Sequence, residues 1–141
     1  MKLTDDEKAL ILPLWEKMAP EAGSLGAEAF QRLFLSFPQK ALIFQGCDIS
    51  QDSPYLFALG EKFINALGDA IKNWDNLQET MASVTDLHVN RRIMPDDYML
   101  LSHCLQVTIA GHFPDDFNIK ANAAWNKFLQ IVSAVLSGRK V

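Results

Sequence analysis

The sequence has little of what marks secreted, disulfide-bonded or membrane-spanning proteins. Its two cysteines, Cys47 and Cys104, lack CxxC or Cys/His spacing, so we expect free thiols rather than a disulfide or a zinc site. Pro13 and Glu16 interrupt the apolar stretch near the N-terminus, so we expect neither a signal peptide nor a membrane span. The net charge is -4 without a long run of like charges, which argues against nucleic acid and anionic membranes as partners. These absences predict a cytoplasmic protein.

Catalytic motifs are missing as well. The chain contains no nucleophile elbow, no Gly-rich phosphate loop, no HExxH and no Cys/His constellation. Its carboxylates cluster at the predicted starts of helices, where they oppose the positive end of the helix dipole. The sequence therefore favours a binding protein over an enzyme.

The pattern that is present is helical. Apolar residues recur three and four positions apart and no stretch alternates at period two for long, which predicts an all-α protein. Thr4 and Glu7 are typical of a capping box, and Pro13 in the following helix is expected to kink or fray it. The pattern predicts six or seven helices, with prolines at the junctions and connectors of unequal length. This favours an irregular helical arrangement over a bundle with uniform short loops. The length of the chain predicts a single domain spanning residues 1–141.

Three predicted helices carry an apolar stripe that should face the core. The helix expected over residues 54–73 has the stripe Phe57, Leu59 or Gly60, Phe63, Ile64 and Leu67. The helix over 95–113 has Tyr98, Leu101, Leu105, Ile109 and His112. The helix that begins after Asn118 has Trp125, Phe128, Leu129, Val132 and Leu136.

The chain has three histidines, and spacing alone does not make any of them a metal ligand. His103 and His112 share a helix but lack the i, i+4 spacing of a metal-binding pair, so we expect structural, partner-facing or hydrogen-bonded roles. His88 ends a helix whose apolar face is Val84 and Leu87, and periodicity favours a core or capping role over a ligand.

Four segments, taken in order, resemble the α chains of vertebrate haemoglobin: LGAEAFQRLFLSFPQ, TDLHVN, YMLLSHCLQVTIAGHFP and KFLQIVSAVLSG. The resemblance extends along nearly the whole chain. It implies a globin fold of six to eight helices around a pocket for haem b. In that family a histidine of the sixth helix binds the haem iron, and TDLHVN places His88 there, so the resemblance makes His88 the proximal ligand.

The resemblance also implies the remaining residues of the haem pocket. Phe44 would wedge the haem, Lys62 would face a propionate, and Asp97 and Tyr98 would be haem neighbours where the family usually has Asn and Phe. The other positions would form an apolar wall, as a flat hydrophobic macrocycle requires. They are Leu67, Val84, Leu87, Ile93, Leu101, Leu105, Val132 and Leu136.

Two positions depart from the family on the distal side of the haem. Leu59 stands where the family has a histidine, and leucine cannot donate a hydrogen bond to dioxygen, which should forfeit roughly 1.5–3 kcal/mol. We therefore expect weaker dioxygen binding, relatively better carbon monoxide binding and faster oxidation. Phe63 replaces the usual valine, and either narrows the ligand cavity selectively or simply fills the space of the missing imidazole.

The resemblance implies a heterodimer with a β-type globin chain, while cooperative assembly is not expected. The positions of the tight contact between unlike chains are Arg32, Leu35, Ser36, Phe37, His103, Val107, Pro114 and Phe117. The second, sliding contact departs from the family at Gln39, Leu42, Ile43, Met94 and the C-terminal residues 139–141. We expect a heterodimer, homodimer or monomer with a Hill coefficient near one.

The function implied is reversible binding of dioxygen or another diatomic gas, for transport or storage, by an α-type haemoglobin subunit of an erythroid cell. One alternative is a haem-based redox enzyme or gas sensor that uses nitric oxide, nitrite or peroxide. Another is a globin scaffold that has lost haem. The presence of Phe44, Lys62 and His88 together argues against that last interpretation.

Overall fold

The computed structural model describes residues 2–82 and 95–137, and every structural statement below concerns these ranges. Helices account for most of them and no strand occurs within them, which confirms the all-α prediction. The α-helices are α1 (Asp5–Met18), α2 (Ala22–Ser36), α3 (Pro54–Lys72), α5 (Pro95–His112) and α6 (Ile119–Leu136), and residues 77–82 are helical as well. Short 3-10 helices are η1 (Ala19–Glu21), η2 (Pro38–Phe44) and η3 (Trp74–Asn76).

The predicted helix starts are capped by side chains. Thr4 and Glu7 form the capping box, with the Glu7 amide 3.1 Å from the Thr4 hydroxyl and the Thr4 amide 2.9 Å from the Glu7 carboxylate. Ser53 caps α3 through a single bond, in which its hydroxyl accepts from the Leu56 amide at 3.0 Å. Pro13 does not fray the helix: α1 continues to Met18, since its buried face anchors the helix on both sides of the proline. The alternative, a kink at Pro13, stays a prediction.

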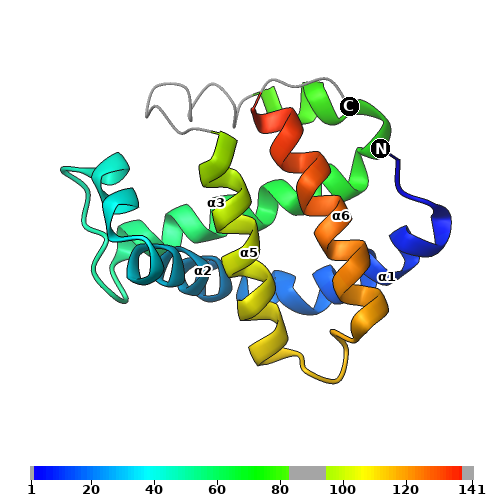
Figure 1. The fold of residues 1–141 in the computed structure, drawn as a ribbon, viewed down its shortest axis with the longest axis horizontal. Helices are drawn as coiled ribbons and strands as arrows, with labels where there is room; N and C mark the ends of the chain where they lie inside the picture. The colour runs from blue at the N-terminus through cyan, green and yellow to red at the C-terminus, as the bar shows by residue number, and fades with distance from the viewer. Residues whose placement is uncertain (1, 83–94, 138–141) are drawn as a thin grey trace.

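Helices α2 and α3 cross at a contact between two glycines. A Cβ atom added at Gly60 would collide with the backbone of Gly26 and Ala27, so the two helix backbones touch there. Helix α5 packs on α2 and also against α6, as Figure 1 shows. This arrangement leaves a space that α2, α3, α5 and α6 border together.

Most of the predicted stripe residues lie in the core. Those of α6 are all buried, and Trp125 and Phe128 are completely so. In α5 the buried stripe residues are Tyr98, Leu101, Leu105 and Ile109.

Two stripe predictions are wrong. His112 is 45% exposed, because the last turn of α5 reaches the surface, where the imidazole lies 2.9 Å from the Glu28 carboxylate. Phe57 is 48% exposed, and its ring covers Gly23 of α2 from outside, where any larger residue than glycine would collide with it. Both side chains therefore lie at the rim of a helix contact rather than inside it.

Cys47 and Cys104 are thiols that are not joined in a disulfide. No helix within residues 2–82 and 95–137 is long and apolar enough to cross a membrane. The predictions for Val84, Leu87, His88 and Ile93, and those for Met94 and residues 139–141, lie outside the described residues.

Candidate functional site

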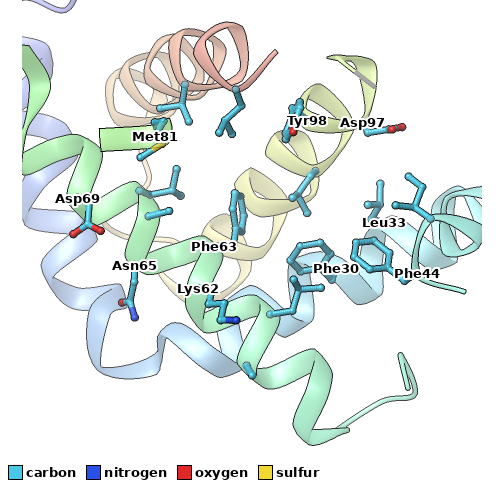
Figure 2. Close-up of a pocket in the computed structure, with 18 of the residues that line it drawn as sticks. Phe30, Leu33, Phe44, Lys62, Phe63, Asn65, Asp69, Met81, Asp97 and Tyr98 are labelled. Carbon is cyan, nitrogen blue, oxygen red and sulfur yellow. The ribbon is translucent and has the colours of Figure 1, made fainter. Parts of the chain in front are cut away.

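A cavity of about 510 Å³ lies between α2, η2, α3, α5 and α6 (Figure 2). Its volume falls in the range of pockets that hold cofactors, roughly 300–1,000 Å³. Most of the wall is apolar, and the polar side chains Lys62, Asn65 and Asp69 lie along α3 on one side of the cavity (Figure 2). The cavity can therefore take a largely apolar ligand that has a polar edge.

The structure brings together ten of the residues that the sequence assigned to the pocket. They are Phe44, Leu59, Lys62, Phe63, Leu67, Asp97, Tyr98, Leu101, Val132 and Leu136. Leu105 is not part of the cavity wall, because it lies about one turn beyond Leu101 and is fully buried in the core. These residues come from four separate elements, so only the fold places them side by side.

Other lining residues were not expected from the sequence. They are Phe30, Leu33, Ile43, Tyr55, Ala58, Asn65, Ala66, Asp69 and Met81. Helical periodicity could have predicted that Phe30 and Leu33 face inward, because they are three residues apart on the buried face of α2. Nothing in the periodicity marks Tyr55, Asn65 or Asp69, which are polar residues on a helix with an otherwise apolar inner face.

Phe30 is the centre of an aromatic cluster on the α2 and α3 side of the cavity. The centroid of its ring lies 5.9 Å from that of Phe63, with an angle of 70° between the ring planes, and 5.9 Å from that of Phe44, with an angle of 84°. Phe34 also packs on Phe44, with a centroid distance of 5.6 Å and an angle of 67° between the ring planes. Edge-to-face pairs of this kind each contribute about 0.5–1.5 kcal/mol beyond their burial. Phe44 and Phe63 are thus held in place through a shared neighbour (Figure 2).

Charged groups occupy two edges of the cavity. Lys62 is exposed at the mouth, on the same helix as Asn65 and Asp69 (Figure 2). At the opposite edge the Lys40 ammonium lies 2.6 Å from the carboxylate of Asp97, whose side chain is only 4% exposed. The mouth therefore offers a solvated cation, whereas the far edge contains an ion pair in which Asp97 is buried and Lys40 is partly exposed.

Tyr98 contributes a neutral phenol to the wall. Burial, together with the negative charge of Asp97, raises the pKa of Tyr98 to about 12. The hydroxyl group consequently keeps its proton throughout the physiological pH range. Within residues 2–82 and 95–137, no group of three or more His, Cys, Asp or Glu side chains is placed to hold a metal ion.

The residues predicted to contact a partner chain lie on or near the surface. Leu35 and Val107 are large apolar side chains that are 78% and 42% exposed. His103 and Pro114 are exposed, and Phe37 and Phe117 are partly buried. The guanidinium of Arg32 lies 3.2 Å from the carboxylate of Glu28, with which it forms an ion pair.

The carboxylate of Glu28 links α2 to the end of α5. Partial burial acts to raise its pKa, but hydrogen bonds from His112 and Arg32 outweigh that effect and lower it. His112 is thus hydrogen-bonded, which is one of the roles expected for it from the sequence.

Comparisons with known proteins agree with this architecture. The family model for globins matches residues 27–136. Haemoglobin subunit alpha-4 and subunit alpha-3 of Xenopus laevis are 47% and 46% identical, each over 99% of both chains. Haemoglobin subunit zeta of Capra hircus is 44% identical over 97% of both chains.

The chain therefore belongs to the globin family. Its similarity to α and ζ subunits over nearly the full length places it among the α-type haemoglobin chains. This confirms the resemblance drawn from the four sequence segments.

Proposed function

We propose that the chain is a haem-binding, oxygen-carrying haemoglobin subunit whose haem b lies in the cavity between α2, η2, α3, α5 and α6. One observation carries the proposal: a cavity of about 510 Å³ that is mostly apolar and has a lysine at its mouth. Haem is a flat hydrophobic macrocycle with two anionic propionates at one edge. The size and polarity of the cavity suit both parts of such a molecule.

Each part of the haem would have its own contacts. Leu67, Leu101 and Val132 are 8% exposed or less and offer apolar surface from three different helices. Such apolar surface favours a hydrophobic macrocycle, because contact with it removes the apolar surface of the macrocycle from water. Phe44 would contact one edge of the ring, and the exposed Lys62 would face a propionate. His88 would bind the iron, a role that rests on its place in TDLHVN.

When bound, ferrous haem supplies the site at which dioxygen binds reversibly. The chain's own side chains set how strongly that ligand is held. Leu59, Phe63 and Phe30 line the cavity without a single N–H or O–H group in their side chains. A polar diatomic ligand therefore gains no hydrogen bond from them, while water is excluded from this part of the wall. We expect low dioxygen affinity with carbon monoxide affinity largely retained.

Absorption spectroscopy tests the proposal. Spectra are taken of the protein as isolated, after dithionite and after carbon monoxide, and the reduced protein is then followed in air. A five-coordinate ferrous spectrum, a carbon monoxide complex and reversible dioxygen binding support the carrier. Rapid oxidation in air without a stable dioxygen form favours the haem-based redox enzyme or gas sensor. No haem uptake overturns the proposal.

The partner we propose is a β-type globin chain, bound through one face in the cytoplasm of an erythroid cell. That face comprises Arg32, Leu35, Phe37, His103, Val107, Pro114 and Phe117. Leu35 at 78% exposed and Val107 at 42% exposed support it, because large apolar side chains at a surface are typical of a contact. The dioxygen binding curve is expected to be non-sigmoidal.

Leu35→Asp tests the contact, with Leu12→Asp as the matched control. Leu12 is also an exposed leucine, at 40%, but lies in α1 outside the proposed face. Sedimentation analysis with an added β chain should show loss of the heterodimer for Leu35→Asp alone. Equal effects of both substitutions would contradict the assignment of the face.

A further inference from the structure

The carboxylate of Glu28 accepts hydrogen bonds from two different helices. Its Oε1 atom lies 2.9 Å from Nε2 of His112, at the end of α5. Its Oε2 atom lies 3.3 Å from Nε and 3.2 Å from Nη2 of Arg32, one turn further along α2. Because an ionised carboxylate can only accept, His112 donates through Nε2. Each oxygen thus has its own partner, and His112 fixes the direction in which the other oxygen faces Arg32.

Arg32 lies where α2 and α5 both contribute to the face proposed for the β-type chain. Leu35, another residue of that face, is three positions further along α2 and therefore on the same side of the helix. Helix α5 packs against α2 (Figure 1). Burial raises the pKa of the Cys104 thiol on α5, whereas the charge of Arg32 acts to lower it, so the guanidinium lies close to α5 as well. Cys104 directly follows His103, which also belongs to the face.

A partner that covers this face would remove a flexible, charged side chain from water, since the side chain of Arg32 is 42% exposed. Ordering such a side chain at an interface costs binding free energy, and covering its charge costs more unless a countercharge is present. Glu28 lowers both costs. Its contact with two N–H groups orders the guanidinium before the partner arrives, and its carboxylate compensates the charge.

The bond from His112 distinguishes this arrangement from an ordinary surface ion pair. An exposed pair of residues on one helix contributes little, because both side chains remain free to move. Here a residue of a second helix holds the carboxylate, so the three side chains form a network between α2 and α5. The contact with Glu28 uses two of the five N–H groups of the guanidinium, and the other three can donate to a partner.

We propose that Glu28 is a positioning residue for the partner contact: it holds Arg32 in place on the face that binds a β-type globin chain, and His112 in turn holds Glu28. This inference rests on the proposed pairing, because it requires a partner that covers Arg32. Glu28 acts through Arg32 and not through a contact of its own with the partner.

The test measures the dissociation constant of the heterodimer by sedimentation, with haem-loaded full-length chains and the β chain of a vertebrate haemoglobin as the partner. Glu28→Ala should weaken the heterodimer about tenfold, because Arg32 is then neither ordered nor compensated. Glu28→Gln should weaken it about threefold, since the amide oxygen still accepts but the charge is lost. His112→Ala should also weaken it about threefold, because the contact between Glu28 and Arg32 remains.

A double-mutant cycle shows whether Glu28 acts through Arg32. In the Arg32→Ala background, Glu28→Ala should change the dissociation constant by less than about twofold, because the side chain that it positions is gone. The urea unfolding midpoint of every variant is measured in parallel. A network that only stabilises the fold would lower the midpoint and weaken the heterodimer equally with and without Arg32.

Glu7→Ala is the matched control. The side chain of Glu7 is 26% exposed, compared with 35% for Glu28, and its carboxylate also joins two helices, because it lies 2.9 Å from Lys127 of α6. Neither Glu7 nor Lys127 belongs to the proposed face. Glu7→Ala should therefore leave the dissociation constant unchanged, even where it lowers the unfolding midpoint.

The outcomes separate the two proposals. A parent chain that does not bind the β chain overturns the proposed pairing and this inference together. Normal binding by the parent with an equal dissociation constant for Glu28→Ala overturns the inference alone, and so does an equal loss of affinity in the parent and Arg32→Ala backgrounds. Should Glu28→Ala fail to fold, Glu28→Gln decides in its place, because a dissociation constant equal to that of the parent would overturn the inference.

Discussion

Replacing Leu59 with histidine should strengthen dioxygen binding. Leu59 is half-buried, lines the cavity and lies one helical turn before Phe63 on α3. A donor introduced there would face the same space as the ring of Phe63. The substitution thus adds one hydrogen-bond donor to the part of the wall formed by Leu59, Phe63 and Phe30, whose side chains have none.

The size of the effect follows from the strength of a hydrogen bond to a polarised acceptor. Such a bond contributes roughly 1.5–3 kcal/mol. At 1.4 kcal/mol per factor of ten, the dioxygen dissociation constant should fall about ten- to hundredfold. Carbon monoxide is less polar when bound, so its affinity should change by no more than about a few-fold. The ratio of the two affinities therefore isolates the hydrogen bond.

Dioxygen and carbon monoxide equilibria of the parent, Leu59→His and Leu59→Met check this prediction. Leu59→Met is the matched control, because methionine has a similar volume and no donor. It should leave both affinities close to those of the parent. An unchanged affinity ratio in Leu59→His, with the ferrous protein still five-coordinate, would refute the reasoning about the apolar wall.

Three further predictions concern packing and pH. Phe63→Val removes the edge-to-face contact with Phe30, whose ring centroid is 5.9 Å away, and widens the cavity. Bulky alkyl isocyanides should then bind at least about tenfold more tightly, while the affinity for carbon monoxide changes little. Equal changes in the two affinities would contradict the idea that Phe63 selects ligands by size. Gly60→Ala should lower the free energy of unfolding by about 3 kcal/mol in urea titrations, because the added Cβ would collide with the backbone of α2, which cannot rotate out of the way as a side chain can. An unchanged free energy of unfolding would contradict the close crossing of α2 and α3. Burial raises the folded-state pKa of Tyr98 from 10 to about 12, so this phenol contributes up to about 3 kcal/mol to stability, which is present below pH 10 and is lost as the pH rises from 10 to 12. Tyr98→Phe should remove that alkaline loss of stability, and an unchanged pH profile would show that another group causes it.

The sequence predicted the helices and ten of the nineteen residues that line the cavity. Capping residues and prolines define where the helices begin, and these local signals held at Thr4, Ser53 and Asn118. Periodicity placed the α5 stripe from Tyr98 to Ile109 in the core. It failed at Phe57 and His112, because periodicity identifies a face of a helix but not where the neighbouring helix stops covering it.

The cavity required more than periodicity. Ten of its lining residues were predicted only through the resemblance to haemoglobin α chains, since contacts between four elements cannot be read from one helix at a time. The aromatic cluster around Phe30 depends on how α2 crosses α3, and the Lys40–Asp97 ion pair depends on how η2 meets α5. Neither pairing has a local sequence signal. Both are consequences of tertiary packing.

The central claim is that the cavity holds haem whose iron is bound by His88, and the Soret spectrum of the parent and of His88→Ala tests it most directly. Both chains are mixed with one equivalent of haem, reduced with dithionite and exposed to carbon monoxide, with His103→Ala as the matched histidine control. The account predicts a five-coordinate ferrous spectrum for the parent and for His103→Ala. His88→Ala should lose that spectrum and regain it when imidazole is added. An unchanged spectrum and unchanged haem affinity in His88→Ala would contradict the assignment.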